Sequence, residues 1–146
     1  MTPIVYTYLL AAGIAFVSAQ SIKFLLNQRL AGTGWRQLFM SGRMPSAHTS
    51  TVFALVTAIA AQDGFDSGLF AVAAVFATLT AYDSMMSRRS SGEQGLALKQ
   101  LLEKSSSMKG PAIPVPHVAL GHTPLEVLAG GLLGISVGIL VVFFIT

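Results

Sequence analysis

The sequence contains no cysteine, and only 10% of its 146 residues are charged. The absence of cysteine excludes a disulfide framework, a zinc–thiolate site and a thiol nucleophile. Soluble domains usually carry about 25% charged residues, so the low charge, together with a hydrophobic content of 53%, indicates a membrane protein. The net charge of +3 is modest and its cations are clustered between apolar segments. This pattern favours contact with membrane lipids or phosphate and argues against a nucleic-acid partner.

Four apolar stretches approach the roughly 20 residues that a membrane-spanning helix needs. They run from Pro3 to Phe24, from after Pro45 to Ala61, from Phe65 to Tyr82, and from Leu125 to Ile145. A further short helix over Glu93–Lys104 has leucines on one side and suits the membrane surface, and an irregular loop is expected over Ser105–Pro116. The predicted fold class is all-α, an integral membrane helical bundle with about four transmembrane helices plus a short interfacial helix. We expect a single domain over residues 1–146.

All nine Lys and Arg residues fall in two of the expected loops. The loop after the first span holds Lys23, Arg29, Arg36 and Arg43, and the loop after the third holds Arg88, Arg89, Lys99, Lys104 and Lys109. The positive-inside tendency then predicts that both basic loops face the cytoplasm of a bacterial-type inner membrane and that both termini lie outside. Cations that belong to an active site would produce the same clustering.

Alternation of four spans brings four helix ends to one side of the membrane. Those ends carry Lys23, then Ser46 and His48, then Asp83, Arg88 and Arg89, and finally His122 and Glu126. Two helix N-termini with unpaired N–H groups, several cations and two histidines suit phosphate binding and chemistry at neutral pH. Asp83 ends an apolar helix, where an acid opposes the helix dipole, so a partner among Arg88, Arg89 and Lys23 is expected.

Three motifs stand at these ends. They are Gly42-Arg43-Met44-Pro45-Ser46-Ala47-His48, Asp83 followed by Arg88-Arg89, and Gly121-His122-Thr123-Pro124-Leu125-Glu126. Their order and their separation by spans resemble the divergent branch of the type 2 phosphatidic acid phosphatase superfamily, which is related to the vanadium haloperoxidases. The resemblance covers nearly the whole chain. It implies a phosphoric ester hydrolase that needs no metal or other cofactor and works through a phosphohistidine.

The resemblance also implies a role for each matching residue. His122 would attack phosphorus, Glu126 would hold its imidazole in the nucleophilic tautomer, and His48 would protonate the leaving oxygen. Phosphate-binding roles fall to Lys23, Ser46, Gly121, and Arg88 or Arg89. The superfamily arginine that precedes the nucleophilic histidine is absent, with Pro116 and His117 in its place. One of the pair Arg88-Arg89 is therefore expected to replace it.

Several of these residues also have a purely structural interpretation. Thr123-Pro124-Leu125-Glu126 is a capping box with proline at the first helical position, which would begin the last helix without any catalysis. Lys23 could extend from a helix end toward water, and the two arginines could only set the topology. His117 is interpreted as a surface residue. Close helix packing is the expected role of four glycines in the last span: Gly130, Gly131, Gly134 and Gly138.

These features predict a membrane phosphatase that hydrolyses a phosphomonoester or pyrophosphate on a lipid. The alternative is a membrane protein that binds lipid phosphate without turnover, because the superfamily arginine is missing. A transporter is a weaker hypothesis, since the middle of the spans carries no charge for a translocation site. Four spans are fewer than the six usual in the superfamily, so a homodimer could complete the bundle.

Overall fold

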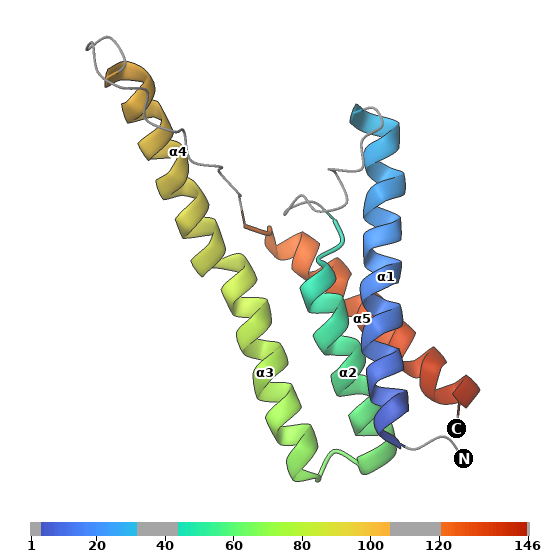
Figure 1. Ribbon diagram of the computed structural model, residues 1–146. Helices are drawn as coiled ribbons and strands as arrows, with labels where there is room; N and C mark the ends of the chain where they lie inside the picture. The colour runs from blue at the N-terminus through green and yellow to red at the C-terminus, as the bar shows by residue number, and fades with distance from the viewer. Residues whose placement is uncertain (1–3, 32–43, 106–120, 146) are drawn as a thin grey trace.

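The computed structural model describes residues 4–31, 44–105 and 121–145, which form helices and, over those ranges, no strand. The helices are α1 (Ile4–Ala31), α2 (Ala47–Asp63), α3 (Gly68–Met85), α4 (Ser87–Ser105) and α5 (Pro124–Ile145). The central helix is α2, which packs against α1, α3 and α5 (Figure 1). The all-α prediction is confirmed. Several predicted features lie outside the described residues: Arg36, Gly42, Arg43, Lys109, Pro116, His117 and the loop over 106–116.

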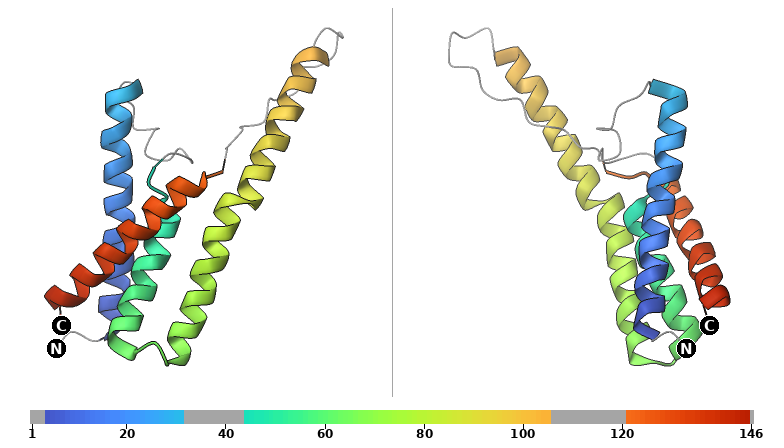
Figure 2. Two further views of the ribbon diagram at one scale, coloured as in Figure 1. Left: turned by 180° about the vertical axis from the view of Figure 1, so that it is seen from behind. Right: turned by 45° about the vertical axis from the view of Figure 1, so that its right-hand side comes forward.

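The two ends of the bundle differ in what they contain. The start of α1, the end of α5 and the turn between α2 and α3 lie at one end (Figures 1 and 2). In that turn Gly64 has a φ of 86°, which favours glycine, and Ser67 caps α3 by accepting a hydrogen bond from the N–H of Phe70 at 3.1 Å. The start of α2, the junction of α3 with α4 and the start of α5 gather at the opposite end. The predicted alternation of helix directions is therefore present.

Three stretches of the described chain are long and apolar enough to cross a membrane. They are Val5–Leu26, Gly68–Leu102 and Pro124–Ile145. The second predicted span, α2, has only 17 residues and packs against α1, α3 and α5. Large apolar side chains point outward, with Val72, Leu128 and Phe143 exposing 69%, 59% and 77% of their surface. An apolar exterior of this extent is what a lipid environment accommodates.

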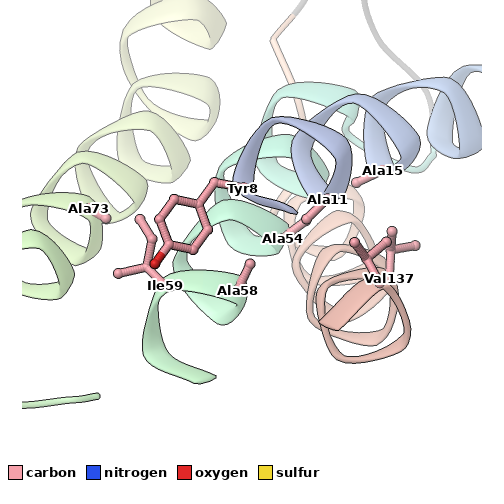
Figure 3. Packing of buried hydrophobic residues seen from close by; sticks show 9 residues of the cluster. Tyr8, Ala11, Ala15, Ala54, Ala58, Ile59, Ala73 and Val137 are labelled. Atoms are coloured by element: carbon pink, nitrogen blue, oxygen red, sulfur yellow. The ribbon is translucent and has the colours of Figure 1, made fainter. Parts of the chain in front are cut away.

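Small side chains fill the interior of the bundle. The alanines Ala11, Ala15, Ala54 and Ala58 are fully buried, and Figure 3 shows them between α1, α2 and α5 with Val137. Tyr8 joins this cluster, and its hydroxyl donates a hydrogen bond of 2.6 Å to Asp63 at the end of α2. Because lipid is as apolar as a protein core, close packing of small residues is the usual way in which membrane helices associate.

The closest helix pair is α2 with α5, where three glycines of α5 face the α2 backbone. A Cβ atom added to Gly130 would lie 2.5 Å from the carbonyl oxygen of Ser46, and one added to Gly138 would lie 2.8 Å from that of Ala54. At Gly134 an added Cβ would collide with the carbonyl oxygen of Ser50. Close packing, the role expected for these three glycines, is confirmed. No other residue would fit at these three positions without moving the helices apart.

The helix predicted over Glu93–Lys104 begins earlier, at Ser87, and runs on from α3 in nearly the same direction (Figure 1). Its start is supported by two ion pairs, one from Arg88 back to Asp83 of α3 at 3.3 Å and one from Arg89 to Glu93 within α4 at 3.1 Å. The predicted start was six residues too late, because these charges are equally common in loops.

We predict that Gly134→Ala lowers the thermal midpoint of the purified protein, whereas Gly131→Ala does not. The added methyl group at residue 134 collides with α2 backbone, and overpacking of this kind costs about 1–3 kcal/mol. At Gly131 the nearest atom to an added Cβ is a Phe53 ring carbon at 3.6 Å, an ordinary contact. Thermal unfolding in detergent, followed by circular dichroism, compares the two variants. Equal midpoints would contradict the packing described here.

Candidate active site

The start of α5 is organised by one carboxylate. Glu126 Oε2 accepts a hydrogen bond from the N–H of Thr123 at 3.0 Å, and Thr123 Oγ1 accepts one from the N–H of Glu126 at 3.4 Å. This is the capping box expected from the sequence. The same Oε2 lies 2.9 Å from Nδ1 of His122. A single oxygen of Glu126 therefore both begins the helix and orients the imidazole.

His122 is fixed by its backbone as well as by its side chain. Only 7% of the side chain is exposed. Helix α3 ends at Met85 and α4 begins at Ser87, and near this junction the carbonyl oxygen of Ser84 accepts a hydrogen bond of 3.0 Å from the backbone N–H of His122. The preceding Gly121 lies against the start of α4, because an added Cβ there would be 2.5 Å from the backbone nitrogen of Arg89. The junction of α3 and α4 therefore positions His122.

The start of α2 is tied to the start of α5. Ser46 is the N-cap of α2 and is fully buried, and its Oγ accepts hydrogen bonds from Thr49 N–H at 3.4 Å and from Thr49 Oγ1 at 3.0 Å. The backbone N–H of Ser46 donates to the carbonyl oxygen of Glu126 at 3.1 Å. His48 follows two residues later and is exposed. The two histidines are thus carried by helix starts that are hydrogen-bonded to each other.

The basic side chains Lys23, Arg88 and Arg89 differ in their burial and in their partners. Lys23 on α1 is buried, with 5% of its surface exposed, although it is charged. It interacts electrostatically with Glu126 and with His48. Arg88 pairs with Asp83 at 3.3 Å, as one of the expected partners of that acid, and it also lies near enough to His48 to act on it electrostatically. Arg89 instead pairs with Glu93 along α4. Of the two arginines, Arg88 is the one that acts electrostatically on His48.

The group of residues at this end can accommodate an anion. His48 has His122, Lys23 and Arg88 as its electrostatic neighbours. A neutral His122 that donates its Nδ1–H to Glu126 has its Nε2 lone pair available as a nucleophile or a base. In the described ranges no group of three or more His, Cys, Asp or Glu side chains is placed to hold a metal ion. The chemistry that these residues can carry out is acid, base or nucleophilic chemistry at a bound anion.

Two contacts that position His122 were not predicted from the sequence. One is the carbonyl of Ser84, which accepts from His122, and no local pattern indicates it because it arises from a break between two helices. The other is the contact between Gly121 and the start of α4. A third feature was visible but unused: small residues at 46, 50 and 54 repeat at the same interval of four as the glycines of α5 that face them. Matching stripes of small residues on two helices indicate a close pair.

A family model described as "Divergent PAP2 family" matches residues 5–137, which include His48, His122 and the Arg88-Arg89 pair. The chain is also similar to the "Uncharacterized membrane protein YuiD" of Bacillus subtilis (strain 168), with 35% identity over 151 residues, covering 93% of this chain and 94% of that protein. No solved structure matches the chain. The protein is therefore an integral membrane protein that belongs to the Divergent PAP2 family.

Proposed function

We propose that this protein is a membrane phosphatase that hydrolyses a phosphomonoester or pyrophosphate on a lipid through a phosphohistidine at residue 122. The observation that carries the proposal is the 2.9 Å contact between His122 Nδ1 and Glu126 Oε2, with His48 and Lys23 close by. A carboxylate that accepts the Nδ1 hydrogen leaves Nε2 of His122 as the nitrogen with the lone pair. The buried Lys23, an electrostatic neighbour of Glu126 and His48, offers a positive charge for a phosphate to neutralise.

The proposed reaction has two steps. In the first, Nε2 of His122 attacks phosphorus, the bond from phosphorus to the ester oxygen breaks, and His48 donates a proton to the departing oxygen. In the second, His48 takes a proton from water, the new phosphorus–oxygen bond forms, and the phosphorus–nitrogen bond breaks to release inorganic phosphate. Lys23 and Arg88 stabilise the negative charge on the equatorial oxygens in both steps. Glu126 stabilises the positive charge that develops on the His122 ring.

A lipid substrate follows from the setting of the site. The site lies at one end of a bundle whose outer surface is apolar, so a phosphate on a lipid headgroup would reach it while the lipid tail stays among hydrocarbon. Substrates of this class include phosphatidic acid, phosphatidylglycerol phosphate and polyprenyl pyrophosphates. The two basic loops support a cytoplasmic position for the site, with both termini across the membrane.

A second candidate is a protein that binds lipid phosphate without hydrolysing it. The observation that favours it is the burial of the His122 side chain, which exposes 7% of its surface and leaves limited access for substrate and water. The arginine that normally precedes this histidine in the superfamily is also missing. Vanadate binding without release of phosphate from any lipid phosphate would support this candidate, and multiple turnovers would exclude it.

We predict that His122→Ala abolishes phosphate release from a panel of lipid phosphates. His48→Ala should lower kcat by about 10²–10⁴-fold, the usual contribution of a general acid, while vanadate still binds. Phosphate release by the purified variants in detergent or liposomes measures both effects. Wild-type turnover by His122→Ala would show that the nucleophile is another group.

We predict that His122 is the Nδ1–H tautomer when neutral, because the carboxylate of Glu126 accepts that hydrogen. Replacing the carboxylate in Glu126→Ala should shift His122 toward the Nε2–H tautomer and reduce turnover. Nitrogen-15 chemical shifts of labelled imidazoles distinguish the two tautomers, and His48→Ala simplifies the assignment. An Nε2–H tautomer in the wild type would contradict the assignment of Nε2 as the attacking atom.

We predict that Arg88→Ala weakens inhibition by vanadate about 10–100-fold, the effect of losing one hydrogen bond to a charged group. Arg89→Ala is the matched control, because its guanidinium pairs with Glu93 and should leave inhibition near the wild-type value. Inhibition curves for the two variants against the same lipid phosphate provide the comparison. A larger loss in Arg89→Ala would reverse the assignment of the two arginines.

A further inference from the structure

A serine hydroxyl bridges α2 and α5 one helical turn below the cap of α2. Ser50 is fully buried, and its Oγ lies 2.9 Å from the carbonyl oxygen of Ser46 in its own helix and 2.9 Å from the carbonyl oxygen of Gly130 in α5. A hydroxyl has one hydrogen, so this hydrogen is shared between the two carbonyls or alternates between them. The bridge lies where the two helix backbones are closest.

This bond differs from the hydrogen bonds that other hydroxyls make in the same bundle. Thr51 and Thr57 of α2 bond the carbonyl four residues earlier in their own helix, at 2.9 Å and 2.7 Å. Such bonds within one helix are common and add little to tertiary structure. Ser50 makes the same bond to Ser46 and in addition reaches across to another helix. The hydrogen bond of its hydroxyl across the two helices therefore depends on the relative position of α2 and α5.

The bridge leads directly to the residues at the candidate active site. The Ser46 that it holds is the N-cap of α2, and the N–H of Ser46 donates to the carbonyl oxygen of Glu126 at 3.1 Å. Glu126 in turn holds the imidazole of His122. Below the bridge, the carbonyl of Ser50 lies against Gly134, so the helices cannot come closer there. The glycine contact sets the minimum separation, and the hydroxyl opposes any increase.

We propose that Ser50 is a positioning residue that sets the spacing between His48 and His122, and so the fit of one phosphate between them. This inference rests on the proposed function for the identity of the anion. Ser50 acts through Ser46 and Gly130. In Ser50→Ala the two carbonyls lose their shared donor while the volume of the side chain changes little, so α2 and α5 can shift relative to each other. A small displacement of reacting groups is enough to lower a rate strongly.

The test compares full-length wild type, Ser50→Ala and the control Thr57→Ala in liposomes. Thr57 lies in the same helix and also faces α5, near Gly138, but its hydroxyl bonds within α2. We expect Ser50→Ala to lower both kcat and vanadate affinity by about tenfold or more, with little change in KM for the lipid phosphate. Thr57→Ala should leave both values near those of wild type. The thermal midpoints of both variants should fall by a few degrees at most. If Ser50→Ala does not fold, Ser50→Cys, which keeps a weak S–H donor, replaces it in the comparison.

The outcomes separate this inference from the proposed function. If wild type hydrolyses lipid phosphates and Ser50→Ala matches it in kcat and vanadate affinity, the positioning role is overturned and the hydrolytic function stands. An equal loss in Thr57→Ala also overturns it, because the effect then belongs to the general stability of the helix pair. If wild type binds vanadate without any hydrolysis, and Ser50→Ala alone binds it more weakly, the hydrolytic function is overturned and the positioning role stands.

Discussion

Three glycines at intervals of four residues let the backbone of α5 lie directly against the backbone of α2. This contact aligns the start of α2 with the start of α5, because Gly130 lies over Ser46 and Gly134 over Ser50. Each of those helix starts carries a histidine, and a backbone hydrogen bond from Ser46 to Glu126 joins them. The separation of the two imidazoles is therefore a property of the helix pair. A side chain at any one of the three glycine positions would alter this separation.

Several residues at this end serve structure and the candidate chemistry together. Glu126 is the acid of a capping box and also the partner of His122, and both roles use the same oxygen atom. Ser46 caps α2 with its side chain and links to α5 with its backbone. Lys23 is buried near Glu126, which supplies part of the compensation that a buried cation requires. In a chain of 146 residues with few charges, most of those charges are concentrated at this end or along α4.

The sequence predicted the helices and their alternation because long apolar stretches and turn residues are local signals. It also predicted the capping box of α5 and a partner for Asp83, because both depend on spacing or on the direction of the helix dipole. The start of α4 at Ser87 was missed, since its support comes from ion pairs between charges that are equally common in loops. The contact of Gly121 with α4 and the bond from His122 to Ser84 could not be predicted, because they join segments that are far apart in the chain. The sequence left open which of Arg88 and Arg89 acts on His48, because that depends on helix phase, and in the structure Arg88 is the electrostatic neighbour of His48.

The most direct test is an experimental structure of the full chain in a lipid bilayer disc with vanadate bound. The account predicts one vanadate at the starts of α2 and α5, with vanadium bonded to Nε2 of His122 and one vanadate oxygen within hydrogen-bond distance of His48. The glycine face of α5 should remain against α2 in that complex. A vanadate bound elsewhere, or two imidazoles too far apart to touch the same anion, would contradict it.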